Sequence, residues 1–311
     1  MSKKTMLYRQ GNAGLTSMNH WHPYLEKYFK LEVIDTAKTY NKQDCFLWVN
    51  YLEVDQSWAK SYIDGGYKIV SDYLWDHYGT PAAIDNILTL KSDNWIIANE
   101  SICYKHQGYD KLQLARTPDK FLLCLMNADR EHRTQLFNEI REYQPDSLIS
   151  YIAKGIHIAG DIDTGHGAWQ RYANINWYNT TYFSLVAETS IADPKFISEK
   201  IFKPMALKHP FVVWGPYNIL NLVKNLGFRT FSHIIDESYD NISDADLRFC
   251  AIMNVVASLR NEYEAGRALF SDPHSLEIIE HNYNLFYDKT LIEDRIIEQE
   301  ILQPILKFVN E

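Results

Sequence analysis

Arg130 and Arg133 are the first side chains whose spacing suggests chemistry. They follow the apolar run Lys120–Met126 and the polar Asn127, and they open a stretch with apolar residues at helical spacing. Residues three apart lie on one face of a helix, so we expect both guanidiniums on one face of its first turn. Two cations there oppose the helix dipole. A bound diphosphate, which arginine can hold bidentately, would explain them. A surface pair bridged to neighbouring carboxylates is the alternative.

A second group of charged residues lies further along the chain. Glu188 ends the apolar run Tyr182–Ala187, and Ser198 is a predicted N-cap for a helix that opens with Glu199 and Lys200. A carboxylate beside a nucleotide sugar can accept hydroxyl groups, and a lysine can neutralise charge on a leaving diphosphate. A plain helix start accounts for Glu199 through the dipole, but it accounts less well for Lys200.

The elements that would position these residues alternate between strand and helix, which predicts an α/β fold with parallel sheets. Ligands bind at the carboxyl edge of such sheets, where both charged groups are expected. The predicted strands are 6–9, 31–35, 45–51, 67–72, 94–99, 120–126, 147–152, 182–187 and 210–214. The predicted helices are 22–29, 56–64, 130–143, 199–207, 219–226, 244–265, 275–287 and 289–310, with Asp129 as the N-cap of the third and Pro204 inside the fourth.

Two Rossmann-like lobes fit the length of 311 residues. The short polar stretch around Pro118 precedes a new strand, so we expect an acceptor-side lobe over 1–117 and a donor-binding lobe over 118–285. The final helical segment, 286–311, is expected to pack back on the first lobe.

Two segments resemble a known family. FISEKIFKPMALKHPFVVWG resembles the F/Y-x-(S/T)-E-K…P-x-V-x-G signature of fucosyltransferase-type enzymes, which have two Rossmann-like lobes (the GT-B architecture). NADREHRTQLFNEI resembles the Arg-x-x-Arg helix that opens the donor lobe of that group. Similar patterns occur in glycosyltransferases of large tailed phages and other viruses. The resemblance covers about Lys120–Ile235, and Phe196 departs from it where Tyr is common.

The resemblance implies a glycosyltransferase, either hexosyl- or pentosyltransferase, that uses a GDP- or UDP-linked sugar and no cofactor. It favours inversion at the anomeric carbon. The acceptor stays open between a glycan, a protein and a hydroxymethylated DNA base. The predicted donor-binding residues, including two that adjoin the family positions, are Asn127, Arg130, Arg133, Glu188, Ser198, Glu199 and Lys200.

The catalytic base is sought in the first lobe, where the ends of strands would face an acceptor. Glu100 and Asp72 follow predicted strands, and His20 follows a glycine-rich turn over Gly11–Ser17. These three are the candidates, in that order. A structural or exposed histidine is the alternative for His20.

Two Asp-x-Asp triplets raise the question of a metal. Asp161–Asp163 lies in a glycine-rich loop, and Asp244–Asp246 lies at a predicted helix start, where capping and the dipole account for acids. We therefore predict no metal site and a metal-independent reaction, in which Arg130, Arg133 and Lys200 replace the metal.

The amino-acid composition limits the kinds of binding partner and the cellular location that we expect. A net charge of -9 gives no general attraction to nucleic acid or to an anionic membrane. No signal-peptide pattern and no long apolar run occurs, which predicts a cytoplasmic protein without a membrane span. The resemblance to viral enzymes implies that this cytoplasm could be that of a virus-infected host cell. Four separated cysteines favour reduced, buried thiols. A non-catalytic nucleotide- or carbohydrate-binding protein is the second reading, and an epimerase is disfavoured because no GxGxxG follows the first strand.

Overall fold

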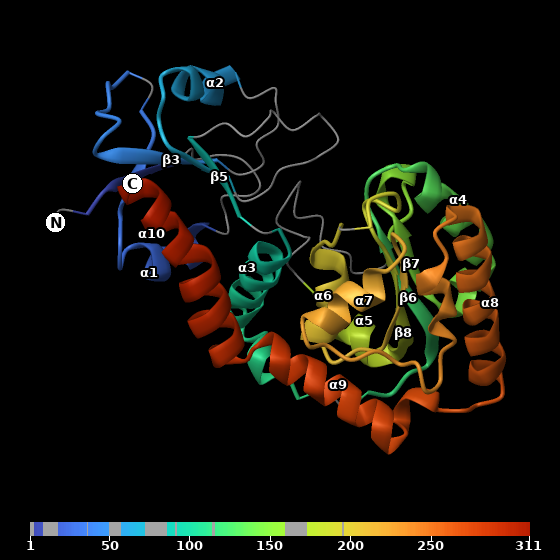
Figure 1. Cartoon of the computed structure of the whole chain (residues 1–311). Helices are drawn as coiled ribbons and strands as arrows, with labels where there is room; N and C mark the ends of the chain where they lie inside the picture. The colour runs from blue at the N-terminus through green and yellow to red at the C-terminus, as the bar shows by residue number, and fades with distance from the viewer. Residues whose placement is uncertain are drawn as a thin grey trace. The chain divides into compact units, whose positions relative to one another are not determined.

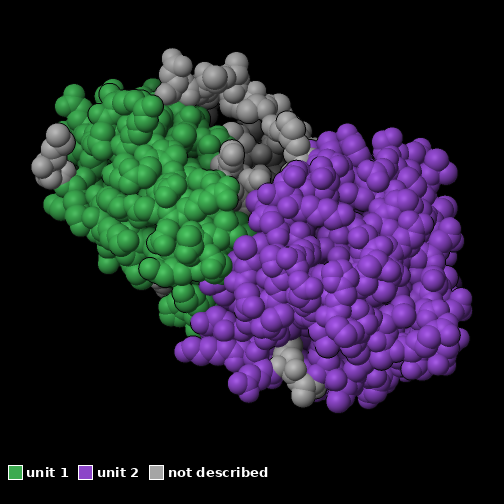
Figure 2. All heavy atoms as spheres, turned by 60° about the horizontal axis from the view of Figure 1, so that its bottom comes forward, with its two compact units in different colours: residues 1–107, 164–171, 288–311 green, residues 108–163, 172–287 purple. Residues whose placement is uncertain are grey.

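The computed structural model describes residues 3–8, 18–35, 37–49, 57–71, 86–90, 92–113, 116–158, 173–194 and 196–311. The chain forms two compact units, which Figure 2 distinguishes by colour. Unit 1 takes in the chain up to Gln107 together with Asp288–Glu311, and unit 2 takes in most residues from Gly108 to Tyr287.

Unit 1 is built on a parallel sheet in the order β2-β1-β3-β4-β5. Its central strand, Cys45–Val49, is buried along its whole length, as expected for a strand covered on both faces. Trp48 of this strand packs against Trp95, which in turn stacks on Trp21 with ring centroids 4.5 Å apart. The strands are β1 (Thr5–Tyr8), β2 (Lys30–Val33), β3 (Cys45–Val49), β4 (Ile69–Ser71) and β5 (Ile87–Thr89).

Helix α3 (Ser92–His106) overturns one prediction, because it occupies the stretch 94–99 that was expected to be a strand. The stretch is apolar on nearly every side of the helix, with Trp95, Ile97 and Ala98 all buried. In a short apolar run of this kind, the spacing of apolar residues does not distinguish a buried helix from a buried strand. The other helices before Gln107 are α1 (Met18–Leu25) and α2 (Ser57–Asp64).

The C-terminal helices belong to unit 1. They are η8 (Thr290–Leu302), wound as a π-helix, and α10 (Gln303–Asn310). Glu293 of η8 pairs with Lys105 of α3 at 2.8 Å, and Lys68 donates to the carbonyl oxygen of Phe308 at 2.6 Å. The end of the chain therefore completes the first unit.

Unit 2 contains a second parallel sheet in the order β7-β6-β8-β9. The strand order changes direction between β6 and β8, which makes their carboxyl ends the switch point of the sheet. Figure 1 shows α5 and α6 on one face of this sheet and α4 and α8 on the other. The strands are β6 (Lys120–Met126), β7 (Leu148–Tyr151), β8 (Thr181–Ala187) and β9 (Phe211–Trp214).

The helices of unit 2 carry several of the predicted local features. Ser198 caps α6 by accepting a bond from the backbone of Lys200, and Pro204 lies inside that helix. Asp244 caps α8 by accepting from the backbone of Leu247. The helices are α4 (Glu131–Ile140), α5 (Ile175–Thr180), α6 (Glu199–Ala206), α7 (Ile219–Asn225), α8 (Ala245–Glu264) and α9 (Pro273–Phe286).

The α/β class with two Rossmann-like parallel sheets is thus confirmed. The cysteines are free, and three of them are buried, but Cys250 is exposed, against the expectation of buried thiols. Within the described ranges, no helix is both long and apolar enough to cross a bilayer.

His209 links β8 to the start of β9 in the core of unit 2. It is 2% exposed, with Nδ1 2.8 Å from the Ser184 hydroxyl and Nε2 3.1 Å from the carbonyl oxygen of Thr181. Burial, with help from the charge of Arg116, holds the pKa of His209 well below its ordinary value. The folded state therefore keeps a neutral ring, while the unfolded chain takes up a proton below pH about 6.5.

This difference predicts a pH-dependent stability. Below pH about 6.5, the His209 contribution to the free energy of unfolding should decline by up to about 1.4 kcal/mol per pH unit. Replacing His209 with Gln should cost about 1–3 kcal/mol at pH 7.5, and the gap to wild type should narrow towards pH 5. Urea denaturation at several pH values measures both. Phe211→Leu, which removes no titratable group, should keep a constant gap, and a constant gap for His209→Gln would contradict the assignment.

Candidate functional site

The start of α4 lies at the switch point of unit 2, directly after β6. Its N-cap residue is Arg130, and no side chain caps the helix. The prediction that Asp129 caps α4 is wrong, because its carboxylate instead accepts from Tyr151 at 2.9 Å and pairs with Lys154 at 2.6 Å. These partners lie on and after the neighbouring strand β7. The N-terminal end of α4 is left without a side-chain acceptor.

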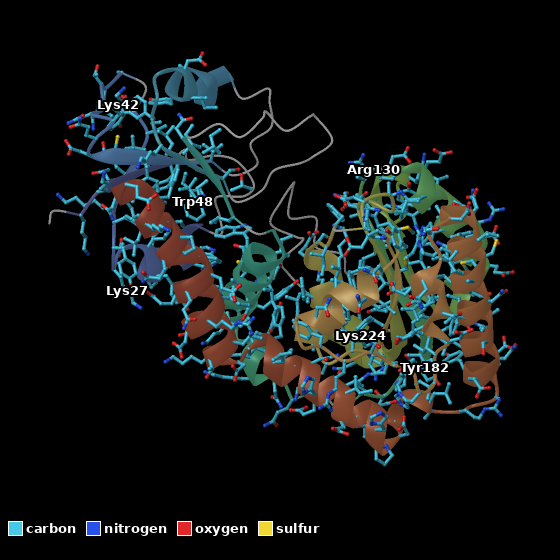
Figure 3. The ribbon with its side chains drawn as sticks, in the orientation of Figure 1. Lys27, Lys42, Trp48, Arg130, Tyr182 and Lys224 are labelled. Atoms are coloured by element: carbon cyan, nitrogen blue, oxygen red, sulfur yellow. The ribbon has the colours of Figure 1, made fainter. Side chains whose placement is uncertain are left out.

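The two arginines of α4 do not share one face, contrary to expectation. Arg130 is exposed, and Figure 3 shows it at the edge of unit 2 where α4 begins. Arg133 is only 2% exposed. The guanidinium of Arg133 donates to the carbonyl oxygens of Ala128, Ala187 and Glu188 at 3.1–3.3 Å. Arg133 thereby ties α4 to the carboxyl end of β8.

His132 belongs to the same contact, and sequence reasoning missed it. Its Nε2 lies 2.9 Å from the carbonyl oxygen of Glu188, and Trp214 at the end of β9 donates to the backbone carbonyl of His132 at 3.3 Å. Burial lowers the pKa of His132, and the charges of Arg133 and Arg130 add to this effect. A histidine between two arginines at a helix start was the available signal.

Glu188 is a fully buried carboxyl at the end of β8. One oxygen, Oε2, accepts from the hydroxyl of Ser198 and from the backbone of Thr189. The other oxygen, Oε1, is buried without a hydrogen-bond partner among the described residues. Burial raises the pKa of Glu188, the charge of Glu199 adds to this, and the charge of Lys200 opposes it. These effects favour retention of a proton on this carboxyl.

The start of α6 reaches the same strand end from the other face of the sheet. The amine of Lys200 donates to the hydroxyl of Thr189 at 3.0 Å and to Glu199 at 2.5 Å. Burial acts to raise the pKa of Glu199, but the charge of Lys200 and its hydrogen bond outweigh this and hold the pKa low. An ionised Glu199 and a charged Lys200 therefore lie beside Thr189.

The structure thus brings two sequence-distant helix starts to residues 187–189: the start of α4 binds their backbone carbonyl groups, and the start of α6 binds the side chains of Glu188 and Thr189. Burial lowers the pKa of Arg133, the charges of Glu188 and Glu199 act to raise it, and the charge of Arg130 acts to lower it. These groups therefore interact electrostatically as well as by hydrogen bonds. The uncapped start of α4, the exposed Arg130 and the partly exposed Lys200 place positive charge at this sheet edge, beside the buried Glu188 and the ionised Glu199; we call this group the cationic margin. Such a margin suits an anion with several oxygens.

Asn127 is the remaining predicted donor residue. It follows β6 directly, and its carbonyl oxygen accepts from the backbone of Ala153 at 3.0 Å. This places Asn127 at the same sheet edge as the two helix starts.

Two of the predicted bases lie in described parts of unit 1, and Glu100 does not have the position that was expected of it. Glu100 is 4% exposed in the middle of α3, where it accepts from Asn99 at 3.1 Å, so it does not end a strand. His20 lies on α1 with its ring 4.3 Å from that of His106. Asp72 lies outside the described residues, as does the turn over Gly11–Ser17. The role of all three as a base stays a prediction.

The two Asp-x-Asp triplets differ in what can be described. Asp244 caps α8, whereas Asp161–Asp163 lies outside the described residues. In the part of the chain that the structure covers, no three His, Cys, Asp or Glu side chains are grouped so that they could hold a metal ion.

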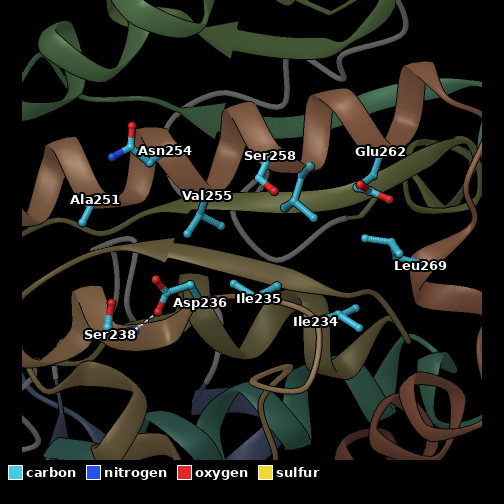
Figure 4. A pocket seen from close by; sticks show the side chains of 11 residues that line it. Ile234, Ile235, Asp236, Ser238, Ala251, Asn254, Val255, Ser258, Glu262 and Leu269 are labelled. Carbon is cyan, nitrogen blue, oxygen red and sulfur yellow. Dashed lines mark hydrogen bonds between the residues drawn. The ribbon is translucent and has the colours of Figure 1, made fainter.

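A cavity of about 570 Å³ lies elsewhere in unit 2, along α8. Figure 4 shows Val255, Ser258 and Glu262 of α8 on one side of it and Ile235 and Asp236 on the other. None of the predicted donor-binding residues lines this cavity. It is therefore a separate feature from the cationic margin at the switch point.

Comparisons with known proteins show a likeness to solved structures but match no family. No protein-family model matches the chain, and no curated protein matches it. The structure is similar to one titled "Crystal Structure of alpha1,3-Fucosyltransferase with GDP", at a TM-score of 0.43 and 13% identity, covering 95% of this chain and 93% of that one. At that level, the likeness transfers no residue role to this chain.

The contact between Ser198 and Glu188 gives a stability prediction. Ser198→Ala removes the cap of α6 and a donor to a buried carboxyl oxygen, so it should lower the free energy of unfolding by about 1–3 kcal/mol. Urea denaturation at pH 7.5 measures the loss. Ser190→Ala is the matched control, because Ser190 is half-buried and accepts only a long 3.4 Å bond from Ala192. Equal stability of the two variants would rule out the proposed cap and bridge.

Proposed function

We propose that the chain is a glycosyltransferase that binds the diphosphate of a nucleotide sugar at the switch point of unit 2. One observation carries this proposal: the starts of α4 and α6 both bind the end of β8, at residues 187–189. Ligands of doubly wound sheets bind at such an edge. The Ser-Glu-Lys step at 198–200 and the Arg-x-x-Arg helix are also the segments that resemble fucosyltransferase-type enzymes.

The residues divide into direct and indirect roles. Arg130 and Lys200 are partly or fully exposed, so they are assigned to the phosphate oxygens, with the uncapped end of α4 beside them. Arg133 has its guanidinium on carbonyl oxygens, so it is assigned to holding the strand end in position. Glu199, kept ionised by Lys200, is assigned to hydroxyl groups of the donor.

The reaction would transfer the sugar in one displacement. An acceptor oxygen forms a bond to the anomeric carbon while the bond from that carbon to the diphosphate oxygen breaks, which inverts the configuration. Negative charge grows on the departing diphosphate, and Arg130 and Lys200 would stabilise it without a metal. A base from unit 1, with Glu100, Asp72 and His20 as candidates, would take the acceptor proton. A glycan, a protein and a hydroxymethylated DNA base remain the candidate acceptors.

A binding protein without turnover is the second candidate function. The burial of Arg133 favours it modestly, because one of the two expected phosphate ligands is engaged with backbone carbonyls instead. Release of free nucleotide diphosphate from a nucleotide sugar separates the two functions, since a binder would bind the nucleotide and leave the sugar attached.

The donor site predicts a nucleotide-dependent gain in stability. A nucleoside diphosphate at about 100 times its Kd should stabilise the fold by about 2.7 kcal/mol, which raises Tm by about 5–10 °C. Arg130→Ala and Lys200→Gln should each lose most of that shift. A thermal-shift screen with GDP-, UDP-, CMP- and dTDP-sugars on wild type and both variants measures this.

Matched controls keep the result specific. Arg141→Ala removes an exposed arginine from the other end of α4, and Lys224→Gln removes a lysine of α7 that pairs with Glu237 at 3.0 Å. Both should retain the full shift. The donor site is refuted if no nucleotide stabilises wild type, or if Arg130→Ala and Lys200→Gln respond like the controls.

A further inference from the structure

Arg248, in the first turns of α8, is a buried cation that the assignments above leave unused. It is 1% exposed, and its guanidinium donates to carbonyl oxygens only. Nε lies 3.1 Å from the oxygen of Gly215, Nη1 lies 2.6 Å and 3.0 Å from those of Ile242 and Ser243, and Nη2 lies 2.9 Å from that of Ile191. One side chain therefore holds together three separate stretches of irregular backbone by hydrogen bonds to their carbonyl oxygens.

Burying this charge has a cost that requires a compensating gain. Burial lowers the pKa of Arg248, and the charges of Asp240 and Asp244 only partly oppose that effect. In the described part of the chain, the hydrogen bonds of Arg248 all go to carbonyl oxygens and none goes to a carboxylate. The four carbonyl bonds satisfy the guanidinium, but an apolar side chain would fill the space without the desolvation cost. An apolar side chain could not donate hydrogen bonds to those carbonyl oxygens, which would leave them without these partners.

The loops that Arg248 joins are the ones that border the candidate donor site. Ile191 lies in the segment that follows Glu188 and Thr189, and Gly215 follows β9. A Cβ atom at Gly215 would lie 3.3 Å from the Cγ of Glu188, so the two loops touch there. Asn218, further along the second loop, holds a left-handed conformation at φ 69°, with its N–H on the carbonyl of Asp240 at 2.6 Å.

A second set of contacts extends the effect of Arg248 to α4. Its guanidinium lies 5.5 Å from the centre of the Trp214 ring. The indole N–H of Trp214 donates to the backbone carbonyl of His132, in the first turn of α4. Arg248 is thus connected to the segments that follow β8 and β9 and, through Trp214, to the start of α4.

We infer that Arg248 is a positioning residue for the nucleotide site, which holds the loops after β8 and β9 and, through Trp214, the start of α4 in the arrangement that receives the diphosphate. This inference rests on the proposed function. Its charge also contributes a positive potential at this sheet edge, which favours an anion there. The side chain acts through the backbone that it holds and does not itself touch the donor.

Arg248→Lys tests the inference, with Arg260→Lys as the control on the same helix. Arg260→Lys likewise replaces a guanidinium that binds two partners, because Arg260 pairs with Asp146 at 2.6 Å and with Glu264 at 2.7 Å. Arg260 lies at the other end of α8, away from the candidate donor site. Both variants should lower Tm by a few degrees. Only Arg248→Lys should weaken binding of the nucleoside diphosphate that best stabilises wild type, by about tenfold in calorimetric Kd.

Further readouts separate positioning from general destabilisation. Amide hydrogen exchange in residues 188–193 should speed up in Arg248→Lys and stay unchanged in Arg260→Lys. If sugar transfer is observed, the donor KM should rise more than kcat falls. Should Arg248→Lys not fold, Trp214→Phe breaks the link to His132 while keeping a ring under Arg248, and it should weaken nucleotide binding severalfold.

The outcomes distinguish the two levels of the proposal. If wild type binds no nucleoside diphosphate, the proposed function fails and this inference fails with it. If wild type binds and both Arg248→Lys and Trp214→Phe bind as tightly as Arg260→Lys, the proposed function stands and the inference is overturned.

Discussion

The organisation of unit 2 depends on how the backbone carbonyl groups at the end of β8 are satisfied. A strand that ends inside a protein leaves polar backbone groups that must find partners. Here Arg133 of α4 donates hydrogen bonds to the carbonyl oxygens of Ala187 and Glu188, and Arg248 of α8 donates one to the carbonyl oxygen of Ile191. Both helices lie on the same face of the sheet, so their first turns are fixed to the strand end from one side (Figure 1).

The opposite face supplies the acidic and hydroxyl groups of the same region. Ser198, the N-cap of α6, and Lys200 in its first turn bind the side chains of Glu188 and Thr189, so the short stretch at and just after the end of β8 contacts three helices. The two carboxyl groups have pKa values shifted in opposite directions. Burial raises the pKa of Glu188, whereas the charge and hydrogen bond of Lys200 hold the pKa of Glu199 low. Arg130, Arg133 and Lys200 therefore lie near a single ionised carboxylate of this group, Glu199. An anionic ligand would reduce the mutual repulsion of the two arginines.

Features set by local backbone chemistry could be predicted from the sequence. Ser198 and Asp244 cap helices because a short oxygen-bearing side chain precedes each one, and Pro204 was recognisable inside α6. The strands of unit 2 were also predictable, since each is a short apolar run between helical stretches. The convergence of the two charged segments followed from the rule that parallel strands end at one edge.

Features decided by tertiary contacts could not be predicted in the same way. Arg130 and Arg133 look equivalent in the sequence, but only Arg133 faces the end of β8, and only the fold decides that. Asp129 is well placed to cap α4, yet Tyr151 and Lys154 compete for its carboxylate from a strand over twenty residues away. The stretch around Trp95 is apolar enough for either a strand or a buried helix, and packing selects the helix.

The assignment of Asp288–Glu311 to unit 1 has a consequence for biosynthesis. During synthesis, the described strands of the unit 1 sheet emerge before unit 2, but the helices that contact Lys105 and Lys68 emerge after it. Unit 2 has all of its own segments once Tyr287 has emerged, so it can reach its final packing earlier. Unit 1 is therefore completed only after all segments of unit 2 have been synthesised.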